Sequence, residues 1–327
     1  MAVPFDLDHD VTYGAVDAIS PLIRRVTAHN PSKFTFKGTG TFIVGHGEGV
    51  AVIDPGPRDD AHLAALLAAV DGEQVTHVLI THTHGDHSPA TAGLVAATGA
   101  RTYGYGPHPD DAVSEAEHSS PDDDTDGDPV DPEEEARRAE QREKERPDTD
   151  FVPDEVVGHG DRITGPGWSI ECLHTPGHIS NHLCFALSEE SALFTGDHVM
   201  GWSTTIVPPP DGDMAAYLDS LRLVAARPET TYYPTHGPSI NDPLSFVNAL
   251  LEHRLERERQ VLAQLANGPA TITEMVPVMY ADVAEELHKP AGRSVLAHLV
   301  KLVADGRVAS DSGPTDSEPI YSLVRET

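Results

Sequence analysis

The stretch THTHGDHSPA, residues 81–90, gathers several side chains that could bind a metal ion. Imidazole and carboxylate groups suit Zn²⁺. A solvated loop does not need so many of them, and a protein core would have to satisfy every one. The chemistry that such a cluster suggests is hydrolysis by water activated at metal ions. The four candidate ligands are His82, His84, Asp86 and His87.

The spacing within this stretch suggests two metal ions rather than one. His82 and His84 are two residues apart, so in an extended segment both can point to the same side and bind the same ion. Gly85 then lets the backbone turn, and Asp86 and His87 can face a second ion. Asp86 can also orient or accept the proton of the attacking water, which makes it the candidate catalytic residue.

Three further candidate ligands come later in the chain, each where an expected strand ends. They are His178 after TPG, Asp197 after LFTG and His236 after YPT. Loops that leave strand ends converge on one edge of an α/β core, where sites are built. Two metal ions about 3.5–4 Å apart can share a carboxylate, and Asp197 is the candidate for that bridge.

The elements that would position these side chains follow an α/β pattern. Over the first hundred residues we expect a strand, a strand, a helix, a strand and a helix around a sheet core. The second helix is expected to begin at Pro89, since proline is favoured at the first helical position. The expected ranges are 41–44, 50–54, 59–72, 75–80 and 89–98.

Strand patterns return after residue 150, and the C-terminal part looks like a separate module. A long helix is expected over 243–266, followed by two helices, a glycine turn and a closing strand. This pattern predicts a small winged-helix module. We therefore expect a catalytic domain over residues 1–242 and a domain over 243–327 that contains the long helix and the winged helix.

An acidic insertion is expected at about residues 107–152. This stretch is broken by prolines and almost free of large apolar side chains, so it cannot bury enough surface to offset the entropy of ordering. It contributes to a formal net charge of −31 over 327 residues. An acidic surface repels phosphate backbones. Cys172 and Cys184 fall in apolar stretches and give no disulfide framework, which fits a cytoplasmic protein.

The quoted motifs resemble a known family. THTHGDH matches the H-x-H-x-D-H signature of the metallo-β-lactamase-fold hydrolases, and TPGH, TGD and YPTHG match their later ligand motifs in the right order. The resemblance covers roughly residues 15–240 and implies a four-layer αββα sandwich with a dinuclear site. It implies two Zn²⁺ per chain, with Fe or Mn as alternatives. The implied ligands are His82, His84 and His178 for one ion, Asp86, His87 and His236 for the other, and Asp197 as the bridge.

The C-terminal part resembles a narrower group within this family. TGDHVMGWSTTIV, MAAYLDSL and HLVKLVADGRV are similar to stretches of lactamase-beta-like proteins, which include a single-strand endoribonuclease of animal mitochondria and fungal polyketide thioesterases. The group is often dimeric, so a homodimer is one expectation. True β-lactamases of this fold usually lack the bridging aspartate. Asp197 therefore argues against β-lactam hydrolysis as the main activity.

Four functions remain open at this point. An acyl hydrolase acting on a small-molecule thioester, ester or lactone is favoured, because the chain is acidic and has no basic or aromatic stripe for a nucleic-acid strand. The alternatives are a metal-dependent endoribonuclease on single-stranded RNA, a low-level β-lactamase and a non-catalytic binding protein. No apolar run is long enough to span a membrane. The candidate substrate contacts are His182, His198, Trp202, Thr204 and Thr205.

Overall fold

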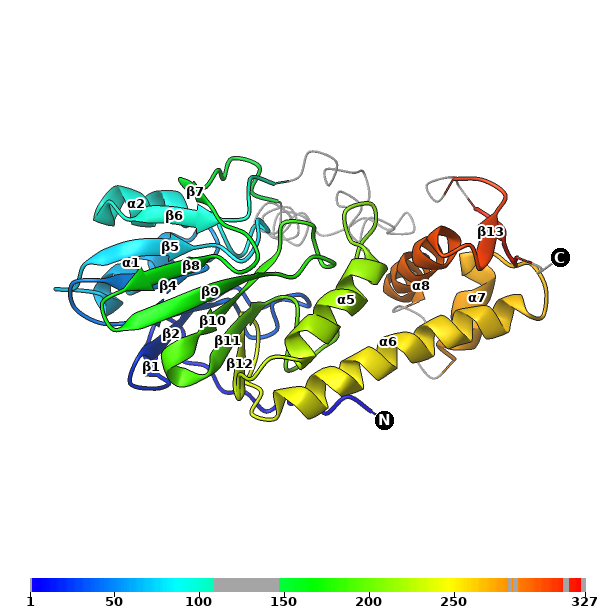
Figure 1. Ribbon diagram of the computed structural model, residues 1–327, viewed down its shortest axis with the longest axis horizontal. Helices are drawn as coiled ribbons and strands as arrows, with labels where there is room; N and C mark the ends of the chain where they lie inside the picture. The colour runs from blue at the N-terminus through cyan, green and yellow to red at the C-terminus, as the bar shows by residue number, and fades with distance from the viewer. Residues whose placement is uncertain (1, 109–146, 282–283, 285–287, 314–317, 325–327) are drawn as a thin grey trace, which may run out of the picture.

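The computed structural model describes residues 2–108, 147–281, 284, 288–313 and 318–324. Two β-sheets lie face to face, with α1 and α2 on one outer side and α5 and α6 on the other (Figure 1). This order of helices, sheet, sheet and helices is the four-layer sandwich that the resemblance implied. The bounds of these helices are Asp60–Ala69 for α1, Thr91–Thr98 for α2, Met214–Ala225 for α5 and Pro243–Leu265 for α6.

The first sheet has seven strands in the order of the sequence. β4 and β5 run parallel, with Ile53 opposite Leu79, so the residues that follow these two strands lie beside each other. The THTHGDH loop therefore leaves the sheet next to Asp54. The strands are β1 (Val16–Ala18), β2 (Ile23–Thr27), β3 (Gly40–Val44), β4 (Val50–Ile53), β5 (Val75–Leu79), β6 (Arg101–Gly104) and β7 (Glu155–Val156).

The second sheet has five strands in the order β12-β11-β10-β9-β8. β11 and β12 are parallel, with Gly196 opposite Pro234, so the loops that carry Asp197 and His236 leave at the same edge. A short 3₁₀ turn, η2 (Ser188–Glu190), joins β10 to β11. The strands are β8 (Arg162–Gly165), β9 (Trp168–His174), β10 (Leu183–Leu187), β11 (Ala192–Gly196) and β12 (Thr231–Pro234).

The central strands are apolar on both faces because each face packs against another layer. In β10, Phe185 and Leu187 lie in the core between the sheets, whereas Cys184 and Ala186 pack toward α5 and α6. This alternation follows from the two-residue repeat of a strand. Cys184 and Cys172 are both buried free thiols, as the sequence predicted.

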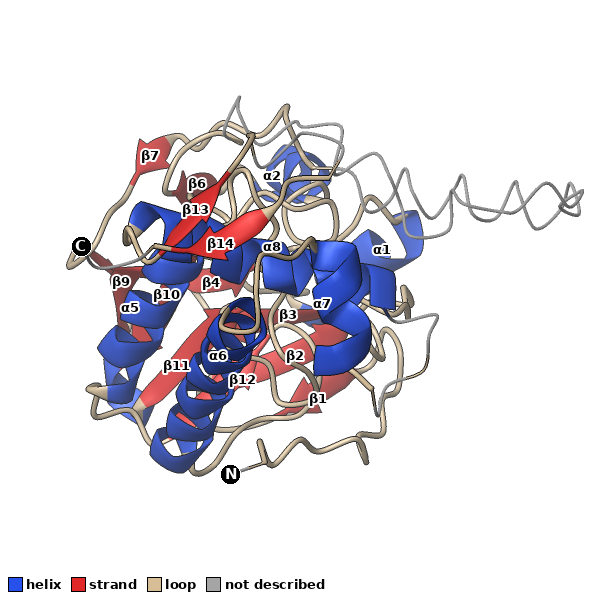
Figure 2. Cartoon of the chain, turned by 90° about the vertical axis from the view of Figure 1, so that its right-hand side faces the viewer, coloured by secondary structure: helices blue, strands red, loops and turns tan. Residues whose placement is uncertain are grey.

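The C-terminal module packs on the second half of α6 and continues the molecule away from the sheets (Figure 1), so that it lies in front of them in Figure 2. Its elements are α7 (Ile272–Met279), α8 (His288–Ala304), β13 (Val308–Ser310) and β14 (Tyr321–Leu323). Glu258 links α6 to this module, because its two carboxylate oxygens lie 2.9 Å from Lys301 Nζ of α8 and 2.8 Å from the Arg307 guanidinium. No helix of the described residues is long and apolar enough to cross a membrane.

The second helix begins later than the sequence predicts. α2 begins at Thr91 rather than at Pro89, because residues 85–90 form turns and a bend that place His87 beside the other candidate ligands. The prediction that Pro89 is the first helical residue was therefore wrong. The insertion expected at 107–152 lies mostly outside the described residues; its described ends are 107–108 and 147–152.

Candidate metal centre

The loops that follow β5, β9, β11 and β12 bring all seven candidate ligands together. Within the described residues, three groups of side chains place their ligand atoms within 4.8 Å of one another. Because the groups share members, they form one continuous cluster with two centres. The groups are His82, His84 and His178; His82, His87 and Asp197; and Asp86, His87 and His236.

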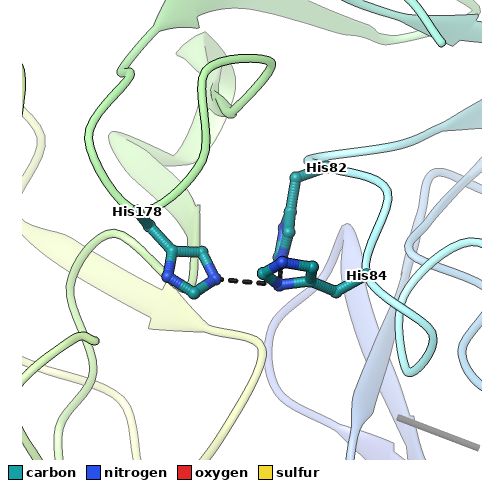
Figure 3. A group of neighbouring side chains, drawn as sticks. All are labelled: His82, His84 and His178. Atoms are coloured by element: carbon teal, nitrogen blue, oxygen red, sulfur yellow. Dashed lines mark hydrogen bonds between the residues drawn. The ribbon is translucent and has the colours of Figure 1, made fainter. Parts of the chain in front are cut away.

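The first centre is formed by three imidazole rings from two loops (Figure 3). His84 Nδ1 lies 3.0 Å from His82 Nε2 and 3.0 Å from His178 Nε2. Three nitrogens bound tetrahedrally at a Zn–N distance of about 2.0–2.1 Å would be separated by about 3.3 Å. The spacing of these nitrogens therefore fits ligation of a single ion.

The partners of the outer ring nitrogens determine which nitrogen faces the centre. Thr81 Oγ1 donates its proton to Asp54 Oδ2 at 2.7 Å, so at 3.0 Å from His82 Nδ1 it can only accept. The Ile206 carbonyl, 2.7 Å from His178 Nδ1, is also only an acceptor. Both histidines therefore carry their proton on Nδ1 and direct a bare Nε2 lone pair inward, as metal ligands do.

The second centre combines two histidines with two carboxylates. His236 Nε2 lies 3.0 Å from Asp86 Oδ2, and His87 Nε2 lies 3.6 Å from the same oxygen. The outer nitrogens again face acceptors, since His87 Nδ1 is 2.9 Å from Asp54 Oδ2 and His236 Nδ1 is 3.3 Å from the Gly38 carbonyl.

Three inward atoms of the second centre have no hydrogen-bond partner among the described residues. They are His87 Nε2, His236 Nε2 and Asp197 Oδ1, and all three are buried. A buried polar atom without a partner is costly. A bound cation would satisfy all three atoms at once, so the donor set fits a metal ion.

Asp197 lies between the two centres. Its Oδ1 is 3.6 Å from His87 Nε2 and 3.4 Å from His236 Nε2, on the side of the second centre. Its Oδ2 is 3.9 Å from His178 Nε2, on the side of the first. The two carboxylate oxygens thus face different centres, which is the arrangement that a bridging ligand requires.

Asp54 contacts the candidate site, although the sequence did not indicate it. It is fully buried at the end of β4 and has a positive φ of 48°. Its Oδ2 accepts from His87, from Thr81 Oγ1 and, at 3.1 Å, from Thr235 Oγ1, while its Oδ1 accepts from Thr81 N at 2.8 Å. Its position was the available signal, because an aspartate directly after a buried apolar strand is the same strand-end pattern that the ligands show.

The two centres differ in electrostatics. Burial, together with the neighbouring histidines, lowers the pKa of His82 and of His84 well below the usual range. Burial also lowers the pKa of His178, although Asp197 opposes the shift. Neutral imidazole is the form that binds metal, so the first centre is ready to bind an ion at neutral pH.

In the second centre the carboxylates dominate. Burial lowers the pKa of His87, but Asp86, Asp197 and Asp54 together raise it well above its usual value. The pKa of His236 is raised in the same way, against burial, by Asp197 and Asp86. Burial acts to raise the pKa of Asp86, yet His87 and His236 lower it to about 2. Protons and a metal ion would therefore compete for this centre.

Two of the five candidate substrate contacts lie behind the centres. The side chains of His182 and His198 are fully buried. His182 Nε2 accepts from Asp197 N at 3.2 Å, and its Nδ1 lies 2.9 Å from Thr175 Oγ1. Gly196 allows this contact, because a Cβ there would lie 2.6 Å from His182 Nε2. We propose that His182 and His198 position the loop of Asp197 rather than touch the substrate.

The other three candidate contacts lie on the loop between β11 and α5. Trp202 and Thr204 are partly exposed, and their contact with substrate stays a prediction. Trp202 stacks on Phe36 with ring centroids 4.9 Å apart. Thr205 is buried, and its hydroxyl donates to the Asp197 carbonyl at 2.7 Å. The sequence had not indicated Phe36 because it lies far from every ligand motif.

The comparison with protein families decides the classification. A family model described as the metallo-beta-lactamase superfamily matches residues 35–236, which include all seven candidate ligands. The chain belongs to the metallo-β-lactamase superfamily. A second model, the beta-lactamase associated winged helix domain, matches residues 271–316. The predicted fold, a metallo-β-lactamase sandwich followed by a winged helix, is therefore confirmed.

Individual relatives agree with this classification. The lactamase-like protein notP of Aspergillus sp. (strain MF297-2) is 32% identical over 317 residues, covering 90% of this chain and 84% of the relative. A protein of Pseudocercospora fijiensis named atrochrysone carboxyl ACP thioesterase is 30% identical over 305 residues, covering 90% of this chain and 78% of the relative. A crystal structure of a beta-lactamase domain protein from Burkholderia ambifaria matches with a TM-score of 0.74 at 19% identity, covering 98% of this chain and 97% of that one.

These findings confirm the prediction of a hydrolase of this superfamily. The superfamily fold implies divalent metal binding, and the clustered histidine and aspartate side chains provide candidate ligands for it.

Proposed function

We propose that the chain hydrolyses acyl thioesters of small-molecule substrates at a centre of two metal ions. The observation that carries the proposal is the position of Asp197, with one carboxylate oxygen toward each group of histidines. Relatives named as thioesterases support the choice of a thioester among acyl substrates. Esters and lactones remain alternatives, since all three are attacked at an acyl carbonyl.

The ligands divide between the two ions as the groups suggest. Zn²⁺ suits this mixture of imidazole and carboxylate, and Fe or Mn is the alternative. When bound, the ions would supply Lewis-acid polarisation of the substrate carbonyl and activation of water near neutral pH. The proposed assignment is His82, His84 and His178 for one ion, Asp86, His87 and His236 for the other, and Asp197 for both.

Asp86 is the proposed catalytic residue. His87 and His236 hold the pKa of this carboxyl at about 2, despite burial, so it is ionised at neutral pH. An ionised carboxylate can orient the attacking water and accept its proton at a carboxylate oxygen. Its side chain is 15% exposed, whereas those of His87 and His236 are fully buried.

The surroundings of the centre favour an acyl group over a nucleic acid. Ile206, whose carbonyl faces His178, has a side chain that is 43% exposed, and Trp202 on the same loop is also partly exposed. Apolar side chains beside a few polar groups are typical of small-molecule sites. The net charge of −31 would repel an RNA backbone.

We propose that residues 1–242 form the catalytic domain and that residues 243–327 form a domain built on α6. The N-cap of α6 supports this boundary, because Asp242 accepts from Ser245 N and Pro243 follows at the start of the helix. Among the described residues, the apolar cluster of the winged helix begins at Val261, whereas the first half of α6 and Ala297 of α8 pack in the cluster beside the second sheet.

The proposal can be tested with purified protein of known metal content. Hydrolysis of an acyl N-acetylcysteamine thioester, the matching oxoester, a β-lactam and a single-stranded RNA would be compared, beside Asp86→Asn as the control. We expect thioester hydrolysis that a chelator abolishes and that Asp86→Asn reduces by about 10²-fold or more. Chelator-sensitive cleavage of RNA without thioester hydrolysis would replace the proposal with the endoribonuclease alternative.

A further inference from the structure

The loop between β11 and α5 connects the candidate metal centre to the long helix α6. It begins with Asp197, and the carbonyl of Ile206 on the same loop orients His178 through the bond to His178 Nδ1. The loop therefore carries one proposed ligand and fixes the ring of another. A residue that fixes the position of this loop therefore also fixes Asp197 and His178.

Arg254 of α6 holds the loop at Thr205. The Arg254 guanidinium donates to the Thr205 carbonyl. The hydroxyl of the same threonine donates to the carbonyls of Asp197, at 2.7 Å, and His198, at 3.0 Å. A short chain of contacts thus runs from the long helix to the backbone of the bridging carboxylate.

Arg254 is an unusual residue to find in this place. It is only 4% exposed, and no carboxylate lies within ion-pair distance of it in the part of the chain that the structure describes. Its guanidinium lies over the ring of Tyr217, 5.4 Å from the centroid, and the Tyr217 hydroxyl donates to the His198 carbonyl at 3.1 Å. Burying a charge without an opposite charge is expensive. A hydrophobic side chain would pack helix against loop without that cost.

We propose that Arg254 is a positioning residue of the metal centre. It acts through Thr205 to fix the backbone of Asp197 and the carbonyl that orients His178. Through Arg254, the long helix α6 then supports the metal centre and is not only the base of the C-terminal module. This inference rests on the proposed metal centre.

Removing the Arg254 guanidinium should weaken metal binding. In Arg254→Met, the Thr205 carbonyl loses its buried donor, and the loop can shift the Ile206 carbonyl away from His178 Nδ1. Loss of a partner behind a metal ligand lowers metal affinity by about 10- to 100-fold. Arg254→Lys keeps the charge over Tyr217 and one donor, so it should restore part of the affinity.

The same helix offers a matched control. Arg257 also lies over an aromatic ring, that of Tyr280 at 4.2 Å, and it also donates to a backbone carbonyl, that of Met279 at 3.2 Å. It faces α7 instead of the metal loop. Arg257 is only partly buried and also donates to Gln260 Oε1 at 2.9 Å, so Arg257→Met removes a similar cation–ring contact and carbonyl bond away from the centre.

The test measures metal affinity and not activity alone. Metal-free wild type, Arg254→Met, Arg254→Lys and Arg257→Met would be titrated with Zn²⁺ against a chromophoric chelator, and Co²⁺ absorption spectra would report the geometry of the bound ion. We expect affinity to fall about 10- to 100-fold in Arg254→Met, to recover partly in Arg254→Lys and to stay unchanged in Arg257→Met. The Co²⁺ spectrum should change in Arg254→Met only.

Each remaining outcome counts against one of the two claims. If wild type binds two ions and Arg254→Met binds them with the same affinity and spectrum, the inference is overturned while the proposed function stands. An equal loss in Arg257→Met would also overturn it, since the effect would then be general destabilisation. If wild type binds no ion, the proposed function fails and the inference fails with it.

Discussion

Replacing Asp54 by asparagine tests whether the buried network behind the ligands controls metal binding. The carboxylate is fully buried and accepts four hydrogen bonds from Thr81, His87 and Thr235. An amide has one oxygen. If that oxygen takes the place of Oδ2, the amide NH₂ group takes the place of Oδ1, which accepts from Thr81 N at 2.8 Å in the wild type. Two hydrogen-bond donors, the amide NH₂ group and the Thr81 N–H, then face each other.

The magnitude follows from these contacts. One buried backbone N–H left without an acceptor costs about 1–3 kcal/mol of folding free energy. Loss of the negative charge also weakens the bond that fixes His87 Nδ1 and makes Nε2 a good ligand. Changes to such partners reduce metal affinity by about 10- to 100-fold, or about 1.4–2.8 kcal/mol. We therefore expect Asp54→Asn to fold with reduced stability and to bind the ion of the second centre more weakly.

The assay is a Zn²⁺ titration against a competing chelator, together with urea unfolding of the metal-free protein. Thr235→Val is the matched control, because it removes only the longest of the bonds to Asp54 and leaves the charge in place. We expect it to change metal affinity by less than about tenfold. Unchanged metal affinity in Asp54→Asn would refute the reasoning, because the orientation of His87 would then not depend on Asp54.

Three further predictions concern acidity and packing. Because the pKa of His87 is raised and that of His82 is lowered, protons compete for the ligands of the second centre at a higher pH than for those of the first. Acidification should therefore release the ion of the second centre first. Metal analysis at a series of pH values would show this as a step at one ion per chain. Burial lowers the pKa of His298 to about 3, so the unfolded chain takes up a proton below about pH 6.5 that the folded chain does not. Stability should therefore fall between pH 7 and 5 by about 2 kcal/mol more in wild type than in His298→Leu, measured by urea unfolding. Gly177 has a φ of 138°, and a Cβ there would lie 2.4 Å from Tyr217 Cα. Gly177→Ala should therefore lower the free energy of unfolding by about 2–3 kcal/mol, measured by urea unfolding. The loss should be smaller in Gly167→Ala, because a Cβ at that position meets nothing within 4 Å.

The sequence predicted the candidate ligands, because each of them lies in a short motif at the end of an expected strand. The strand-end positions of His178, Asp197 and His236 were enough to expect convergence, and the structure brings these side chains together with the THTHGDH loop. Strand-end positions predict convergence because the loops that follow parallel strands leave the sheet at the same edge. The convergence therefore depends on the topology of the sheet and not on any single residue.

The parts that were missed depend on contacts between distant residues. Asp54 was included in an expected strand, and its place at the end of that strand does not show that Thr81 and Thr235 converge on it. Arg254 looked like one more charged residue of a long helix, and only the packing of α6 against the loop of Thr205 shows that it is buried. The start of α2 was misplaced because the turn through His87 continues past Pro89.

The most direct test of the central claim is the rate of thioester hydrolysis as a function of metal ions bound per chain. Metal-free protein would be titrated with Zn²⁺, and both quantities would be measured on the same samples. The account predicts no hydrolysis without metal and full activity at two ions per chain. Full hydrolysis by metal-free protein, or two bound ions without hydrolysis of any acyl substrate, would contradict it.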